Sequence, residues 1–206
     1  MKSHKQTKIW LEKYNAQAPK TGDPAPDFEL RDVHGDNPVR LSNLIGDRPV
    51  ALIFGSFTWI DEQEETVGLR DLFETYQQVH FLTIYIRKTN PVDDWYPGKR
   101  AIHLLQRISA AVPQSEIKEP GSMSERRKAA ANCDRLQKYG IHLLVDEMDD
   151  RVNKAYGAYP ARLYLIGLDG CVVYAGGMGP WDFYPEKLGE AIESYLERVW
   201  LVIGNR

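Results

Sequence analysis

The chain has few cysteines, no long apolar run and no strong excess of charge of either sign. Its 206 residues include two cysteines, Cys133 and Cys171, which are too few for a disulfide scaffold and are typical of a reducing compartment. A net charge of −3 gives no basic surface of the kind that nucleic acid requires. No apolar run approaches the roughly 20 residues of a membrane-spanning helix, and the polar, basic residues 1–14 lack the apolar stretch of a signal peptide. These absences predict a cytoplasmic protein with neither nucleic-acid nor membrane partners.

Motifs for metals and phosphates are missing as well. His80, His103 and His142 are dispersed, with no carboxylate or cysteine at metal-ligand spacing. Residues Gly176–Gly179 suggest a phosphate-binding loop, but Pro180-Trp181 follows them instead of the Lys-Ser/Thr that such a loop carries. We expect a tight turn there, and the sequence predicts neither a metal nor another cofactor.

The composition is that of one ordinary soluble domain, with 43% apolar and 27% charged residues. The expected domain covers residues 1–206, with an N-terminal extension at 1–21. A long excursion at 89–121 contains four prolines and two glycines, a pattern typical of functional lids or of irregular connections.

Apolar runs alternate with helical patterns along the rest of the chain. Strands are expected at 28–30, 39–41, 50–54, 80–86, 141–145, 163–168 and 171–175, and helices at 61–76, 100–111, 124–139, 152–156 and 186–199. Ser124 is the expected N-cap of the third helix, with Glu125 in its first turn and Gly140 after its end. This order predicts an α/β, thioredoxin-like fold, in which helices flank both faces of a mixed central sheet.

The six residues Gly55-Ser56-Phe57-Thr58-Trp59-Ile60 join the expected strand 50–54 to the helix 61–76. At such a turn the backbone N–H groups converge, and the positive end of the helix dipole stabilises a thiolate or selenolate. The position that suits a redox nucleophile carries Trp59, which can neither ionise nor attack.

Four segments resemble the iodothyronine deiodinase family, in the same order and over about residues 22–196. The first is similar to the Gly-x-x-Ala-Pro-x-Phe segment of peroxiredoxin-like proteins, and the second to the deiodinase motif Gly-Ser-Cys-Thr-Sec-Pro. The segments are Gly22–Leu30, Gly55–Ile60, Asp149–Pro160 and Gly176–Pro180. The resemblance implies a thioredoxin-like fold and an oxidoreductase ancestry. In that fold a cis-proline often faces the active-site turn, and Tyr159-Pro160 occupies its place.

The departures from the family pattern affect its chemistry. The family's selenocysteine falls on Trp59 and a nearby cysteine falls on Phe57. Its acidic pair and histidine fall on Arg87, Lys88 and Asn90. Because all of these groups are replaced together, we expect the reductive chemistry to be lost, and whether any reaction remains is open.

Each candidate site residue has two interpretations. Trp59 is either a stacking platform for a ligand or an apolar plug that fills the vacant nucleophile position. Asp61 either stabilises the helix dipole or, if desolvated beside Trp59, acts as a general acid or base. Cys133 lies on an apolar helix face typical of core cysteines, with a relocated reactive thiol as the alternative.

The leading hypothesis is a repurposed protein that binds a small apolar or aromatic molecule at the former active-site turn. Asp61 is the candidate catalytic residue, and the candidate ligand-binding residues are Phe57, Thr58, Trp59, Trp95, Tyr159 and Pro160. One alternative is a thiol oxidoreductase that uses Cys133. Another is a non-catalytic interaction module. The oligomeric state stays open, with a homodimer as one option.

Overall fold

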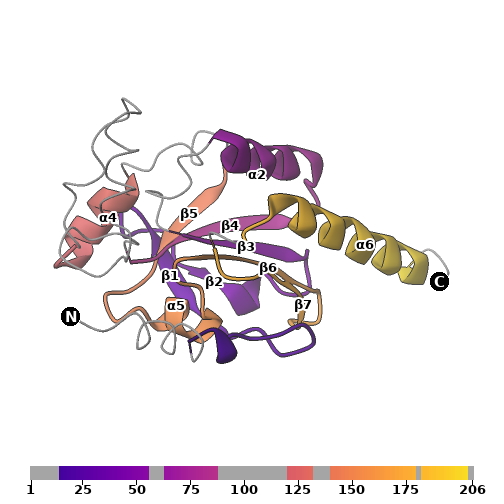
Figure 1. Cartoon of the computed structure of the whole chain (residues 1–206), viewed down its shortest axis with the longest axis horizontal. Helices are drawn as coiled ribbons and strands as arrows, with labels where there is room; N and C mark the ends of the chain where they lie inside the picture. Colours follow the sequence, from indigo (N-terminus) through magenta and orange to yellow (C-terminus); the bar gives the residue numbers. More distant parts are fainter. Residues whose placement is uncertain (1–13, 56–62, 88–119, 132–139, 180–181, 204–206) are drawn as a thin grey trace.

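The computed structural model describes residues 14–55, 63–87, 120–131, 140–179 and 182–203 (Figure 1). Most of the predicted excursion at 89–121, the predicted helix 100–111 and Cys133 lie outside these residues. The same holds for five predicted site residues, namely Phe57, Thr58, Trp59, Asp61 and Trp95.

The described strands form one mixed sheet in the order β2-β1-β5-β4-β3-β6-β7. They are β1 (Glu29–Asp32), β2 (Val39–Arg40), β3 (Val50–Gly55), β4 (His80–Tyr85), β5 (His142–Val145), β6 (Ala161–Ile166) and β7 (Val172–Ala175). Strands β3, β4 and β5 run parallel, while β1, β6 and β7 pair antiparallel with their neighbours on the central side. The predicted α/β class and mixed sheet are confirmed, and the predicted N-terminal strand pair extends this sheet through β5.

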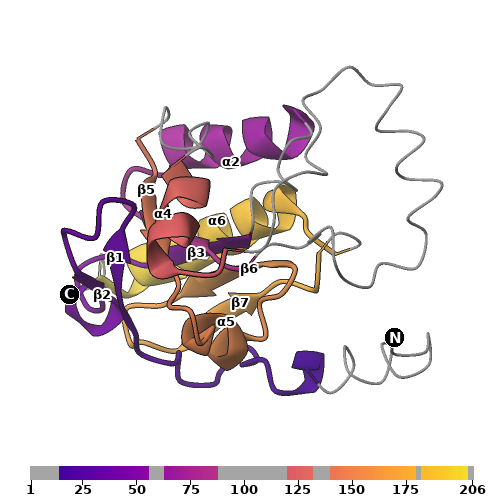
Figure 2. The ribbon, with the colours of Figure 1, turned by 90° about the vertical axis from the view of Figure 1, so that its left-hand side faces the viewer.

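Helices cover both faces of the sheet (Figure 2). They are α2 (Gln63–Thr75), α4 (Met123–Ala131), α5 (Arg151–Tyr156) and α6 (Pro185–Ile203), with a short 3₁₀ helix, η1 (Leu41–Asn43). Because β3 is buried at every position, its sequence carries a continuous apolar run rather than an alternating pattern. β6 is also buried at every position, and Arg162 interrupts its apolar run. Alternate side chains nevertheless separate into two cores. Ala51 and Ile53 pack with α2 and α6, whereas Leu52 and Phe54 pack with α5.

Helix α4 begins earlier than predicted, and its cap is Ser122 instead of Ser124. The Ser122 hydroxyl accepts a hydrogen bond from the Glu125 N–H at 3.3 Å. The Glu125 carboxylate in turn accepts one from the Gly121 N–H at 2.7 Å. A reciprocal cap of this kind requires a hydroxyl three residues before the glutamate, a spacing that Ser122 has and Ser124 lacks.

Strand β6 also begins two residues before its predicted start, at Ala161. The sequence pattern missed Ala161 and Arg162 because an arginine interrupts the apolar run. In the described residues no helix has the length and apolar character needed to cross a membrane.

Candidate functional site

Strands β3, β4 and β5 end at the same edge of the sheet, and β6 begins there. Gly55, the last residue of β3, is the Cα partner of Ala161, the first residue of β6. The Ile86 N–H donates to the Gly55 carbonyl at 3.2 Å, and the Asp146 N–H donates to the Tyr85 carbonyl at 2.9 Å. In open α/β sheets ligands bind outside the carboxyl ends of the strands, so this edge is the candidate site.

Tyr159 and Pro160 lie at this edge, immediately before Ala161. The Tyr159–Pro160 peptide bond is cis, as the position in the fold predicts. Pro160 is buried and Tyr159 is half-buried. Of the six predicted ligand-binding residues, the structure describes these two, and their function there stays a prediction.

The predicted glycine turn meets the same edge. The Gly179 N–H donates to the Ala161 carbonyl at 2.9 Å, and the Gly176 N–H donates to the Leu163 carbonyl at 2.8 Å. A Cβ on Gly179 would lie 3.0 Å from the Ala161 Cβ, so glycine permits this close approach. The turn therefore packs directly against the start of β6, beside the end of β3.

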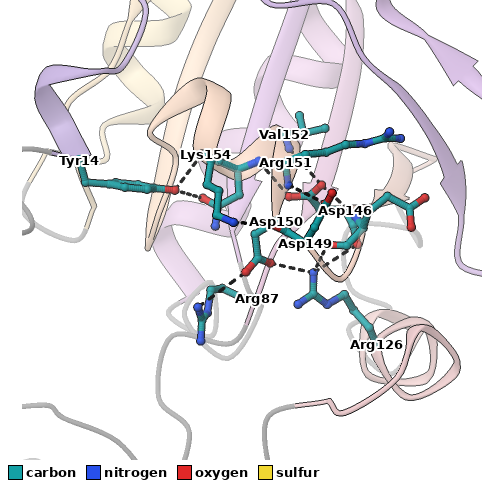
Figure 3. A network of polar contacts seen from close by, with 11 residues as sticks. Tyr14, Arg87, Arg126, Asp146, Asp149, Asp150, Arg151, Val152 and Lys154 are labelled. Carbon is teal, nitrogen blue, oxygen red and sulfur yellow. Dashed lines mark hydrogen bonds and ion pairs between the residues drawn. The ribbon is translucent and has the colours of Figure 1, made fainter.

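A buried carboxylate, Asp146, follows β5 at this edge (Figure 3). It has no exposed surface and accepts backbone hydrogen bonds from Glu147 at 2.8 Å, Val152 at 3.3 Å and Asn153 at 2.9 Å. Burial raises the pKa of Asp146 to about 6, although these three N–H groups favour its charged form. Asp146 thus caps the start of α5. Sequence reasoning missed it because an aspartate after a strand reads as an ordinary turn residue.

Asp150 joins three elements through two arginines. Its Oδ1 accepts a hydrogen bond at 2.9 Å from Nη1 of Arg126, a residue of α4 that is 2% exposed. Its Oδ2 lies 3.6 Å from Nη1 of Arg87, which follows β4. Arg126 Nη1 also donates to the Glu147 carbonyl at 2.6 Å. Arg87 stands where the resemblance places an acid, and here it helps to neutralise Asp150.

Tyr14 and Asn15 reach this edge from the N-terminal side. The Tyr14 hydroxyl donates toward the Asn153 carbonyl at 2.9 Å and the Asn153 Oδ1 at 2.8 Å. Burial, together with the charge of Asp150, raises the pKa of Tyr14, so the phenol stays protonated. Asn15 accepts a hydrogen bond from Nη2 of Arg162, which comes from β6.

No described group of three or more histidine, cysteine or acidic side chains is arranged to hold a metal ion. His80 pairs with Asp47 at 3.0 Å, and His142 is exposed. Desolvation and the neighbouring Asp169 carboxylate raise the pKa of the Cys171 thiol, which disfavours the reactive thiolate. Cys171 is therefore a weak nucleophile.

Three comparisons with known proteins bear on this site and its fold. The family model described as iodothyronine deiodinase matches residues 4–198. Thyroxine 5-deiodinase of Sparus aurata is 31% identical over 176 residues, which are 84% of this chain and 60% of that protein. The Rattus norvegicus protein of the same name is 31% identical over 180 residues, which are 86% of this chain and 54% of that protein. The chain thus spans little more than half the length of these curated relatives.

Among solved structures, peroxidoxin BcpB from Mycobacterium tuberculosis matches with a TM-score of 0.53 and 20% identity. The match covers 85% of this chain and 97% of that protein. At this level of identity the likeness shows the fold alone, which is the predicted thioredoxin-like fold.

The raised pKa of Asp146 predicts how the stability of the protein depends on pH. A carboxyl group with a higher pKa in the folded state stabilises the fold below its ordinary pKa and loses that contribution as pH rises through about 6. We expect Asp146 to lower the free energy of unfolding by about 2 kcal/mol between pH 4 and pH 7. Urea unfolding at a series of pH values measures this slope, which Asp146→Asn should remove.

Asp149→Asn is the control, because Asp149 is an exposed carboxylate of the same loop. That variant should keep the wild-type slope. Equal slopes in wild type and Asp146→Asn would mean that Asp146 has the same pKa in the folded and unfolded chains.

Proposed function

The chain belongs to the iodothyronine deiodinase family, and we propose that it has lost the family's reductive chemistry and binds a small apolar or aromatic molecule at the former active-site turn. The observation that carries the proposal is Trp59, which stands where the resemblance places the family's selenocysteine. An indole has no ionisable proton in the physiological range, so it cannot replace a thiolate or selenolate as a nucleophile. It does offer a large flat surface for stacking.

The described residues near the edge support the loss of redox chemistry. Arg87 occupies a family acidic position and pairs with Asp150 instead of supplying a free carboxylate. Cys171 has a raised pKa, which is the opposite of what a catalytic thiol requires.

The geometry of the edge supports binding. Tyr159, Pro160 and the glycine turn meet at the end of β3, from which the chain continues directly to Phe57, Thr58 and Trp59. Aromatic side chains with a few polar groups are typical of sites for flat, weakly polar ligands. In this proposal Trp95 completes the aromatic wall, and Asp61 supplies cofactor-free acid–base chemistry.

The proposal places the protein in the cytoplasm, with a small molecule as its partner. The two cysteines, of which Cys171 is free, support a reducing compartment. A homodimer is compatible with the proposal and is not needed for it.

Negligible deiodinase and thiol peroxidase activity is the first expected outcome. Purified protein should release no iodide from iodothyronines and should consume no dithiothreitol in the presence of peroxide above the rate of a protein-free blank. The matched variant is Cys133→Ser. Turnover in wild type that disappears in Cys133→Ser would establish the alternative function, a thiol oxidoreductase.

Trp59→Ala tests the binding surface. A panel of flat aromatic molecules, titrated by NMR, should yield ligands whose affinity falls about tenfold or more in the variant because the stacking area is lost. Trp200→Ala, in the last turn of α6, is the control and should leave affinity unchanged. If Trp59→Ala instead lowers the free energy of unfolding and alters no ligand's affinity, Trp59 is a structural plug.

Asp61→Asn tests the acid–base proposal on any molecule that the protein converts. Turnover should fall about a hundredfold or more while the dissociation constant stays nearly unchanged, because the amide cannot transfer the proton. Glu65→Gln changes a neighbouring carboxylate and should keep full turnover. Equal rates in wild type and Asp61→Asn would leave Asp61 as a residue that stabilises the helix dipole.

A further inference from the structure

Arg162 is a buried guanidinium whose hydrogen-bond partners are both neutral. The residue is 3% exposed and lies in β6, directly after Ala161. Nη1 lies 3.4 Å from the Tyr164 hydroxyl, and Nη2 donates to the side-chain oxygen of Asn15. Nε is buried without a hydrogen-bond partner, and Arg162 forms no ion pair with any residue of the described chain.

Arg126, the other buried arginine of the described residues, has the charged partner that Arg162 lacks. Arg126 is 2% exposed, and its guanidinium meets the Asp150 carboxylate at 2.9 Å. A buried charge is strongly unfavourable unless an opposite charge and hydrogen bonds compensate for its lost hydration. The chain supplies that compensation for Arg126 and, within the described residues, leaves Arg162 without it. Groups that weaken the fold in this way are typical of binding sites.

Arg162 lies at the candidate site. It is the Cα partner of Phe54, which precedes the final residue of β3. The aromatic rings of Phe54, Tyr156 and Tyr164 contact one another on the same face of the sheet, with centroids 5.0 to 6.1 Å apart. These apolar surroundings weaken dielectric screening, so an anion beside the guanidinium would be held more strongly than in water.

Asn15 is the exposed hydrogen-bond partner of the guanidinium, and its hydrogen bond to Arg162 Nη2 is only partly buried. A guanidinium has five N–H donors, of which two serve Asn15 and Tyr164. A carboxylate that displaced the neutral amide of Asn15 would gain a charge-assisted hydrogen bond, and the fork of N–H groups matches its two oxygens.

We propose that Arg162 is a ligand-binding residue that receives the carboxylate of a flat aromatic acid, with the Asn15 amide occupying that position in the free protein. This inference rests on the proposed function, because it names the charged group of the ligand that the aromatic residues bind. It adds a residue of β6, which lies far along the chain from the deiodinase-like segment Gly55–Ile60. It also predicts that neutral aromatic molecules bind less tightly than the matching acids.

The test compares 2-naphthoate with 2-naphthamide, which has the same ring system and no charge, by calorimetric titration. Wild-type protein should bind 2-naphthoate at least tenfold more tightly than 2-naphthamide. Arg162→Gln should bind the two molecules equally, and Arg162→Lys should keep part of the preference. Arg151→Gln removes an exposed arginine of α5 and is the control for net charge, so it should behave as wild type.

Asn15→Asp provides an independent test that does not remove Arg162. The new carboxylate would pair with the guanidinium within the chain, so the variant should melt at a higher temperature than wild type and lose its preference for 2-naphthoate. This variant, with Arg162→Lys, decides the matter if Arg162→Gln does not fold.

The outcomes separate this inference from the proposed function. If wild type binds both molecules equally, or if Arg162→Gln keeps the preference for the acid, the inference is wrong and aromatic binding stands. If wild type binds neither molecule, aromatic binding at this site is itself wrong. An Asn15→Asp protein with unchanged melting temperature and unchanged preference would also overturn the role of Arg162.

Discussion

The antiparallel pairing of β6 with β3 is the constraint on which the candidate site depends. Its register sets Ala161 opposite Gly55, so the chain enters β6 at the point where it leaves β3. The cis Tyr159–Pro160 bond and the glycine turn are carried to the same edge by this register and by the hydrogen bond from Gly179 to Ala161. A shift of one residue would move every β6 side chain to the other face of the sheet and would take Arg162 away from Phe54.

The polar groups of the edge show how the fold accommodates charge in its interior. Asp146 is held by three backbone N–H groups at the start of α5, and Asp150 is neutralised by Arg126 and Arg87. These contacts join α4, α5 and the ends of β4 and β5. Arg162 differs, because its two partners are neutral. Charge compensation is therefore the physical property that separates the structural arginine from the proposed ligand-binding one.

Membership of a redox family does not by itself assign redox chemistry to this chain, because activity depends on particular groups and not on the fold. By the resemblance, the family's nucleophile, acids and histidine fall on Trp59, Arg87, Lys88 and Asn90, and we propose that the reductive chemistry is lost with them. Arg87 is the replacement whose contacts the structure describes, and it serves an ion pair. The proposed function follows from this loss: the former active-site turn would bind a ligand, with proton transfer as its proposed chemistry.

Local patterns determined much of the fold. Continuous apolar runs identified β3, β4, β5 and most of β6, because strands buried on both faces carry such runs regardless of their partners. The glycine turn followed from a residue type whose backbone preferences are intrinsic, and the place of Pro160 followed from the fold that the resemblance implies. The tryptophan at position 59, where the resemblance places the family's nucleophile, is likewise found in the sequence alone.

Tertiary structure decided which polar residues matter. Arg162 and Asp146 look like ordinary surface residues in the sequence, and burial by partners far along the chain gives them their character. Asn15 and Phe54 meet Arg162 across more than a hundred residues, and Asn153 reaches Asp146 only after α5 folds back against the end of β5. The charge of Arg126 is compensated by Asp150, a residue of another element, so the pairing of buried charges depends on the folded chain. Sequence alone therefore determined the framework and the tryptophan at position 59, and only the folded chain decided which charges are paired.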